Sequence, residues 1–171
     1  MNRLQFATLL SWADEEGIQG RKRLQKVVFM LQQAGCDLNC HYILHHYGPY
    51  SRDVADTCDE MVAAGLIEES QRMGGIQYRY KLAPRTIELL KKSSPDTRLK
   101  AFQSKWISLL KEDLWTLELG STILYFYQKN SDWNDAMQKA CNFKKKQPET
   151  PPNKKALEFA KRMTPSPAVK S

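Results

Sequence analysis

Candidate metal ligands are concentrated in one short segment, CDLNCHYILHH, at residues 36–46. The side chains that could bind a metal there are Cys36, Cys40, His41, His45 and His46. Four nitrogen or sulfur ligands in a tetrahedron suffice for zinc. However, the spacing C-x3-C-H-x3-H-H lacks the paired knuckles of structural zinc sites, and on a strand His45 and His46 would point to opposite faces. Packing and strand polarity explain these residues, so we expect no metal site.

Nucleophilic or acid–base catalysis has no marker in the chain. We find no nucleophile elbow, no glycine loop suited to a phosphate and no paired carboxylates in a predicted cleft. The pair Gly74-Gly75 is typical of a tight turn instead. We therefore expect no catalytic residue, no enzymatic activity and no cofactor.

Basic side chains suggest a different chemistry, which is contact with the phosphates of nucleic acid. One group of basic side chains lies at the start of the predicted second helix, and another lies on the predicted hairpin. A serine and an arginine stand at the start of the helix between these two elements. We expect duplex DNA to contact Arg21, Lys22, Arg23, Lys26, Ser51, Arg52, Arg72, Arg79 and Lys81. The alternative is that the cations of residues 21–26 form a solvated face and pair with acidic side chains.

Acidic side chains dominate the predicted third helix and oppose its insertion into a DNA groove. Its exposed positions hold one arginine and four carboxylates, which would repel the phosphate backbone. The alternative function is therefore a protein-interaction module in which this helix meets an unidentified basic partner. The residues assigned to that contact are Asp53, Asp56, Asp59 and Glu60.

The elements that must position these residues follow the order helix, helix, short strand, helix, hairpin. Apolar periodicity predicts helices over residues 2–16 and 20–35, and β-forming residues predict a strand over Tyr42–Tyr47. Gly48 and Pro49 form a rigid corner before a helix that starts at Ser51 and ends at Gly65. Its inward stripe is Val54, Cys58, Met61 and Val62. Two strands joined through QRMGG then make a hairpin, so the order is that of a winged helix-turn-helix.

The C-terminal half is predicted to be helical. Helices are expected from Pro84, over residues 97–113, over residues 114–128 as the central buried helix, and over residues 132–143. Glu118 lies in that buried helix and should form an ion pair. KKKQPETPPN is predicted to be an irregular linker, Asn153 to cap a last short helix, and TPSPAVKS to be frayed. Lysines around this helix could bind nucleic acid, anionic lipid or an acidic groove of a partner. Our expectation is instead that the helix docks on the protein and that the tail is solvated.

These elements predict an α+β chain that is mostly α, a winged helix-turn-helix with a C-terminal helical extension. We expect a winged-helix domain over residues 1–95, a helical part packed on it over residues 96–143, and a basic linker with a short terminal helix over residues 144–171.

The composition is that of an ordinary globular chain of 171 residues, with 42% hydrophobic and 26% charged residues. No apolar run approaches the roughly 20 residues of a membrane span, and the N-terminus lacks a signal-peptide cleavage pattern. We expect a cytoplasmic protein with reduced cysteines and no membrane partner. Residues 1–70 carry 6 basic and 10 acidic side chains, whereas residues 71–171 carry 20 and 9. This split suggests a polyanionic partner or a complementary acidic face, and it leaves a homodimer open.

Four segments, RLQKVVFMLQ, YGPYSRDV, GLIEE and LELGSTILYFYQK, resemble the bacterial and archaeal YwgA-like proteins and, more distantly, the SocA-like or Panacea antitoxin domain. The similarity runs over most of residues 20–128. It implies a winged-helix-like domain with a helical C-terminal part, in a group often found near mobile-element, defence or toxin–antitoxin functions. It implies no known catalytic residue. The expected function is thus a DNA-binding regulator or accessory factor, with an antitoxin-like or defence-complex subunit as the alternative.

Overall fold

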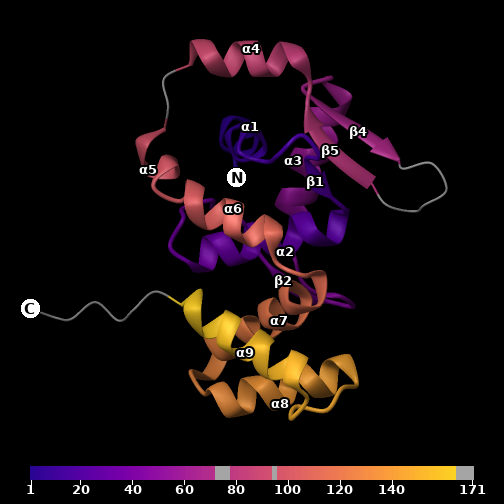
Figure 1. Cartoon of the computed structure of the whole chain (residues 1–171), viewed down its shortest axis with the longest axis vertical. Coiled ribbons are helices and arrows are strands. Elements are labelled where there is room, and N and C mark those ends of the chain that lie inside the picture. The colour runs from indigo at the N-terminus through magenta and orange to yellow at the C-terminus, as the bar shows by residue number, and fades with distance from the viewer. Residues whose placement is uncertain (72–77, 94–95, 165–171) are drawn as a thin grey trace, which may run out of the picture.

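The computed structural model describes residues 1–71, 78–93 and 96–164, and it is α+β with mostly helical structure (Figure 1). The first eight elements are α1 (Arg3–Ser11), β1 (Ile18–Gln19), α2 (Arg21–Gln33), β2 (Ile43–His45), β3 (Gly48–Tyr50), α3 (Arg52–Ala63), β4 (Ile67–Gln71) and β5 (Tyr78–Leu82). The others are α4 (Pro84–Lys92), α5 (Thr97–Lys100), α6 (Gln103–Lys111), α7 (Leu114–Asn130), α8 (Trp133–Lys144) and α9 (Pro151–Arg162).

Two small antiparallel sheets organise the first half of the chain. β4 and β5 form the predicted hairpin, and β1 joins the free side of β5, which gives the strand order β1-β5-β4. The second sheet pairs β2 with β3, and Ile43 stands opposite Tyr50. The turn predicted within QRMGG falls on residues 72–77 and lies outside the described residues.

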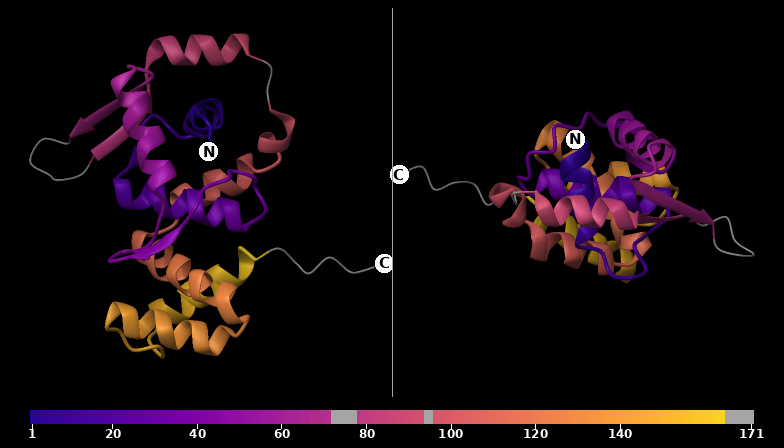
Figure 2. Two further views of the ribbon diagram at one scale, coloured as in Figure 1. Left: turned by 180° about the vertical axis from the view of Figure 1, so that it is seen from behind. Right: turned by 90° about the horizontal axis from the view of Figure 1, so that it is seen from above.

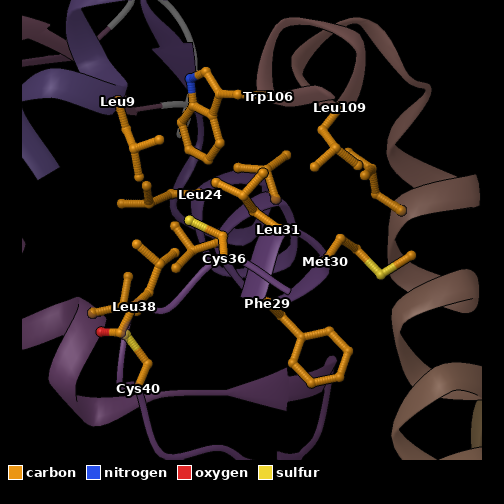
Figure 3. Packing of buried hydrophobic residues seen from close by; sticks show 14 of the residues in the cluster. Leu9, Leu24, Phe29, Met30, Leu31, Cys36, Leu38, Cys40, Trp106 and Leu109 are labelled. Carbon is orange, nitrogen blue, oxygen red and sulfur yellow. The ribbon is translucent and has the colours of Figure 1, made fainter. Parts of the chain in front are cut away.

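Helix α2 is at the centre of the molecule. Residues 24–31 of this helix are all buried, because α6 and α7 both pack against it. Figure 3 shows Leu24, Phe29 and Leu31 of α2 among core side chains from other elements, including Trp106 and Leu109 of α6. One hydrophobic cluster thus includes buried residues from the N-terminal and the C-terminal halves of the chain.

Helix α7, in the lower part of Figure 1, packs against both α8 and α9, in agreement with the central buried helix that its all-round apolar sequence predicted. Leu117, Leu119 and Ile123 are fully buried. Gly120 lets α9 approach closely, because a Cβ at this position would stand 2.9 Å from Cδ1 of Phe159. The central helix of the C-terminal half is confirmed.

Several predicted boundaries were wrong. The first helix ends at Ser11 rather than at residue 16, since Gly17 turns the chain with φ +66° into β1. The last helix begins at Pro151, so Asn153 lies inside it, where its side chain accepts a hydrogen bond from Trp115 Nε1. The end TPSPAVKS lies outside the described residues from position 165.

The largest difference concerns the Gly48-Pro49 corner. The sequence predicted it only as the bend before the third helix. In the structure Gly48–Tyr50 is itself the strand β3. It pairs with β2, which is Ile43–His45 and therefore shorter than the strand predicted over Tyr42–Tyr47. Residues 46–47 form the turn between them. The corner is therefore one arm of a hairpin that leads directly into α3.

None of the helices in the described ranges combines the length and the apolar character needed to cross a bilayer.

Candidate functional site

The segment that starts α3 is held by two consecutive residues of α2. The Lys26 ammonium donates a hydrogen bond to the Pro49 carbonyl oxygen at 2.6 Å. The Gln25 side chain accepts from the Ser51 backbone N–H at 2.8 Å and donates to the Ser51 carbonyl at 3.0 Å. Because Ser51 then caps α3 by accepting from the Val54 N–H, α2 fixes the position at which α3 begins.

Gly48 brings the hairpin onto α7. Its φ of +95° lies in the region that favours glycine, as the sequence predicted. A Cβ at this position would overlap the Thr122 hydroxyl, which donates to the Glu118 carbonyl at 2.7 Å. The same Cβ would stand 3.6 Å from the Lys26 ammonium. The hairpin, α2 and α7 therefore meet at one point, which we call the lysine junction: Lys22, Lys26, Gly48, Pro49, Glu118, Thr122 and Lys144.

The lysine junction places three amines around one carboxylate. The Glu118 carboxylate lies 3.5 Å from the Lys144 ammonium and 3.9 Å from that of Lys22, which confirms the predicted ion pair. Lys26 is only 2% exposed. Burial lowers the pKa of Lys26 from 10.5 to about 7, and repulsion by Lys144 and Lys22 adds to this effect while Glu118 opposes it. Burial also lowers the pKa of Lys144.

The β2–β3 hairpin carries two exposed large side chains, Tyr47 in its turn and Ile43 at its opposite end. Ile43 is 61% exposed and Tyr47 is 53% exposed. The Lys22 ammonium lies 3.6 Å from the centroid of the Tyr47 ring, so this lysine supports the ring from the side of α2. The left view of Figure 2 shows the hairpin at the start of α3.

Helix α3 presents an acidic outer face. Val54, Cys58 and Met61 are buried, as predicted, so the opposite side of the helix faces solvent. We call the exposed set the acidic face of α3, and it consists of Arg52, Asp56, Asp59 and Glu60. Arg52 pairs within the helix with Asp56 at 2.7 Å, and Glu60 pairs with Arg3 at 2.8 Å.

Asp53 is the remaining carboxylate assigned to a partner, and it is half-buried at the first turn of α3. It accepts a hydrogen bond from the His41 backbone N–H at 2.7 Å, and this bond is the main reason that the pKa of Asp53 is lowered. Asp53 therefore helps to position the chain before β2, and its carboxylate is less free than those of the acidic face.

Several cations that we expected to contact DNA are bound within the protein. Arg21 donates to Glu69 at 2.9 Å and to the Tyr80 hydroxyl at 2.9 Å. Arg23 donates to the carbonyls of Leu110 and Glu112 at the end of α6. Arg21 is thus in an ion pair, and Arg23 stabilises the last turn of a helix.

Two members of the expected DNA contact are inaccessible. Lys26 was placed on the solvent-facing half of its helix, and this was wrong, because α7 and the hairpin cover that side. Ser51 is also fully buried. The apolar periodicity of α2 could not reveal this burial. Its apolar stripe marks only one side of the helix, whereas neighbouring elements pack on more than one side.

The rest of that set is dispersed. Arg52 is exposed but bonded to Asp56, and Arg79 pairs with Glu16. Lys81 stands opposite Glu68 in the β4–β5 pairing, and Lys22 lies in the lysine junction. Arg72 lies outside the described residues.

The candidate zinc ligands are not brought together. Cys36 and Cys40 are buried, and burial raises the pKa of Cys36 to about 11. The His45 and His46 rings contact each other with centroids 4.8 Å apart, so the prediction that they point to opposite faces was wrong. The strand ends at His45, and alternation therefore does not extend to His46. Within the described ranges, no group of three or more His, Cys, Asp and Glu side chains could hold a metal ion.

Two contributors to the lysine junction were not predicted from the sequence. Lys144 was assigned to a basic linker, and Thr122 was treated only as part of an apolar helix. Both reach the junction through the packing of α8 against α7 and of α7 against the hairpin. A signal was present for Thr122, since it is one of three buried polar residues, with Thr116 and Ser121, in a helix that is largely apolar.

Comparison with known proteins gives one relative that bears on the family. The chain is 32% identical over 117 residues to the protein named "Uncharacterized protein YwgA" from Bacillus subtilis (strain 168), and the match covers 67% of this chain and 69% of that protein. No family model matches the chain.

Proposed function

This chain belongs to the YwgA family, and from that starting point we propose that it is a protein-interaction module whose acidic α3 face binds a basic surface of a partner protein. The observation that carries this proposal is the composition of the exposed side of α3. Asp56, Asp59 and Glu60 lie there with a single arginine of the same helix. Such a face attracts cationic surfaces and repels nucleic-acid phosphates.

A winged helix is the scaffold that we propose for this module. The order α1, β1, α2, α3, β4, β5 and the sheet order β1-β5-β4 support this interpretation. In helix-turn-helix proteins the helix in the position of α3 is the one that is presented to a ligand. The clamp of Gln25 and Lys26 on residues 49–51 supports the same role here, because it holds the start of α3 rigidly.

The β2–β3 hairpin adds exposed apolar and aromatic side chains to the proposed contact. Tyr47 and Ile43 are exposed beside an acidic helix, and aromatic side chains in a rigid setting are typical of interface hot spots. The proposed partner therefore offers a basic rim around an apolar recess. The group that the sequence segments resemble is expected near mobile-element, defence or toxin–antitoxin functions, and this expectation supports a partner encoded beside this chain.

The test is co-purification with the product of the adjacent gene. We expect Asp56→Lys combined with Asp59→Lys to weaken the complex by about tenfold or more, since opposite charges become like charges at the contact. Glu149→Lys with Glu158→Lys makes the same change of charge on and beside α9 and serves as the control. Equal affinity of the α3 variant and the wild type for that protein would contradict the proposal.

A DNA-binding regulator is the second candidate, and the order of the elements favours it. In that function the β4–β5 hairpin contacts phosphates through Arg79 and Lys81. Tight duplex binding that falls steeply with salt, and whose salt dependence is lessened by Arg79→Ala with Lys81→Ala, would support this candidate. Unchanged salt dependence in that variant would count against it.

A further inference from the structure

Beyond the proposed protein contact, we propose that the outer surface of α5 and α6 binds the phosphate backbone of nucleic acid. This surface is separate from α3 and from the β4–β5 hairpin. We call it the α5–α6 strip, and its members are Arg98, Lys100, Ser104, Lys105, Ser108 and Lys111. In Figure 1, α5 leads into α6, which crosses the molecule beside α2.

The packing of α6 determines which side chains the strip exposes. Trp106 and Leu109 are fully buried against the core, so the opposite side of the helix faces outward. Ser104, Ser108 and Lys111 are spaced at i, i+4 and i+7 and share that outer side. Lys105 is half-exposed next to them. The exposed side of α6 is therefore made of lysines and serines.

The four cations of the strip form no ion pair among the described residues, a property that Lys92, Lys129 and Lys145 share. Among described residues, no carboxylate lies within 4.0 Å of the side-chain nitrogens of Arg98, Lys100, Lys105 or Lys111. By contrast, lysines 139, 154 and 161 of α8 and α9 each pair with a carboxylate. The positive charge of the strip is thus available to an external anion.

Nearby carboxylates are engaged elsewhere. The Asp96 side chain accepts hydrogen bonds from the backbone N–H groups of Arg98 and Leu99 and so caps α5. Just beyond α6, the Glu112 and Asp113 carboxylates both accept from Lys155 at 2.6 Å. Asp37 lines the same cavity as Arg98 at one end of the strip, without an ion pair between them. Lys155 therefore offsets part of the negative charge at the end of α6, and the Asp96 carboxylate is held by the cap of α5.

The chemistry of the strip matches phosphates better than lipids or a protein groove. Lysine and arginine neutralise phosphates, and serine hydroxyls donate to phosphate oxygens. Nine residues of α6 extend about 13 Å, a length over which duplex DNA presents several phosphates. A membrane-binding helix needs large apolar side chains on the face that it inserts. No exposed large hydrophobic residue of the described chain belongs to the strip, although Leu4 lines the same cavity as Lys100.

Fluorescence anisotropy of the full chain with a labelled mixed-sequence duplex of about 20 base pairs tests the proposal. If each of the four cations meets one phosphate, the slope of log K against log salt is about −3.6, and affinity falls about 100-fold between 50 and 200 mM salt. The triple variant Lys100→Gln, Lys105→Gln, Lys111→Gln should reduce the slope to about −0.9. These side chains are exposed or half-exposed, and circular dichroism confirms that the variant is folded.

A matched control removes three lysines that have ion pairs. Lys139→Gln, Lys154→Gln and Lys161→Gln change the net charge by the same amount, and they should keep most of the wild-type slope. Equal losses in the two triple variants would overturn the proposal, because net charge alone would explain binding. Absence of duplex binding at low salt, or loss only in Arg79→Ala with Lys81→Ala, would overturn it as well. Binding to phosphatidylserine vesicles but not to the duplex would assign the strip to a membrane instead.

The two proposals fail separately. The α5–α6 variant leaves the acidic face of α3 unchanged, and the Asp56→Lys, Asp59→Lys variant leaves the strip unchanged. Loss of the adjacent gene's product from the second variant with normal duplex binding would confirm the protein contact independently of the strip.

Discussion

The ammonium of Lys26 in α2 donates a hydrogen bond of 2.6 Å to the carbonyl oxygen of Pro49 in β3, and the lysine side chain is buried as it does so. A buried amine normally destabilises a fold unless it is paired. Here it joins α2 to the strand that leads into α3, while Glu118 of α7 attracts it. The same residue therefore links the position of α3 to the C-terminal helices.

Stability should rise with pH between about 7 and 8.5 because of Lys26. Its pKa is about 7 in the folded chain and 10.5 when exposed, so in this window the unfolded chain binds more protons. The free energy of unfolding then increases by on the order of 1 kcal/mol per pH unit. Lys26→Met should abolish most of this slope in urea titrations at several pH values, leaving the smaller contribution of Lys144.

The upper limit of that window is set by the cysteines. Burial raises the pKa of Cys36 to about 11 and of Cys58 to about 12, so above about pH 9 the unfolded chain loses these protons first and stability falls. The same pH slope in Lys26→Met and in the wild type would contradict a lowered pKa of Lys26.

Gly48→Ala should destabilise the protein by about 2 to 4 kcal/mol. The new Cβ requires a left-handed backbone angle and overlaps the Thr122 hydroxyl. Gly35→Ala is the matched control, since Gly35 has φ +100° but a Cβ there would stand 4.0 Å from Cζ of Phe102, without overlap. Comparing the thermal unfolding of the two variants distinguishes the effect of the overlap with Thr122 from the effect of the backbone angle alone. Equal losses would show that the hairpin does not pack on Thr122.

Glu118→Gln should lower the pKa of Lys26 further. Glu118 is the carboxylate that favours the charged form of this lysine, and its removal leaves the repulsion from Lys144 and Lys22 unopposed. NMR titration of 13C-labelled lysine side chains measures the midpoint directly. We also expect a loss of about 1 to 3 kcal/mol in unfolding free energy, since Lys144 keeps a buried charge without its partner. A raised or unchanged midpoint would argue against this arrangement.

Local sequence signals determined which segments form helices and where several of them begin. Ser51 and Asp132 cap α3 and α8 through their own side chains, as predicted, whereas Asp113, which was placed in the preceding helix, caps α7. Each cap depends on residues within three positions, so the sequence is enough to find it. The inward stripe of α3 and the buried character of α7 follow from periodicity in the same way.

The sequence by itself also determined three features of the site. They are an acidic third helix, a Gly-Pro segment whose first backbone angle requires glycine, and an excess of basic residues after position 70. Only the tertiary structure decided which charges are free. Lys26 and Pro49 are 23 residues apart and Lys144 and Glu118 are 26 apart, so whether they meet depends on how whole helices pack. Burial and pairing are properties of that packing, and for this reason Lys26 proved inaccessible while the cations of α5 and α6 remained exposed or half-exposed.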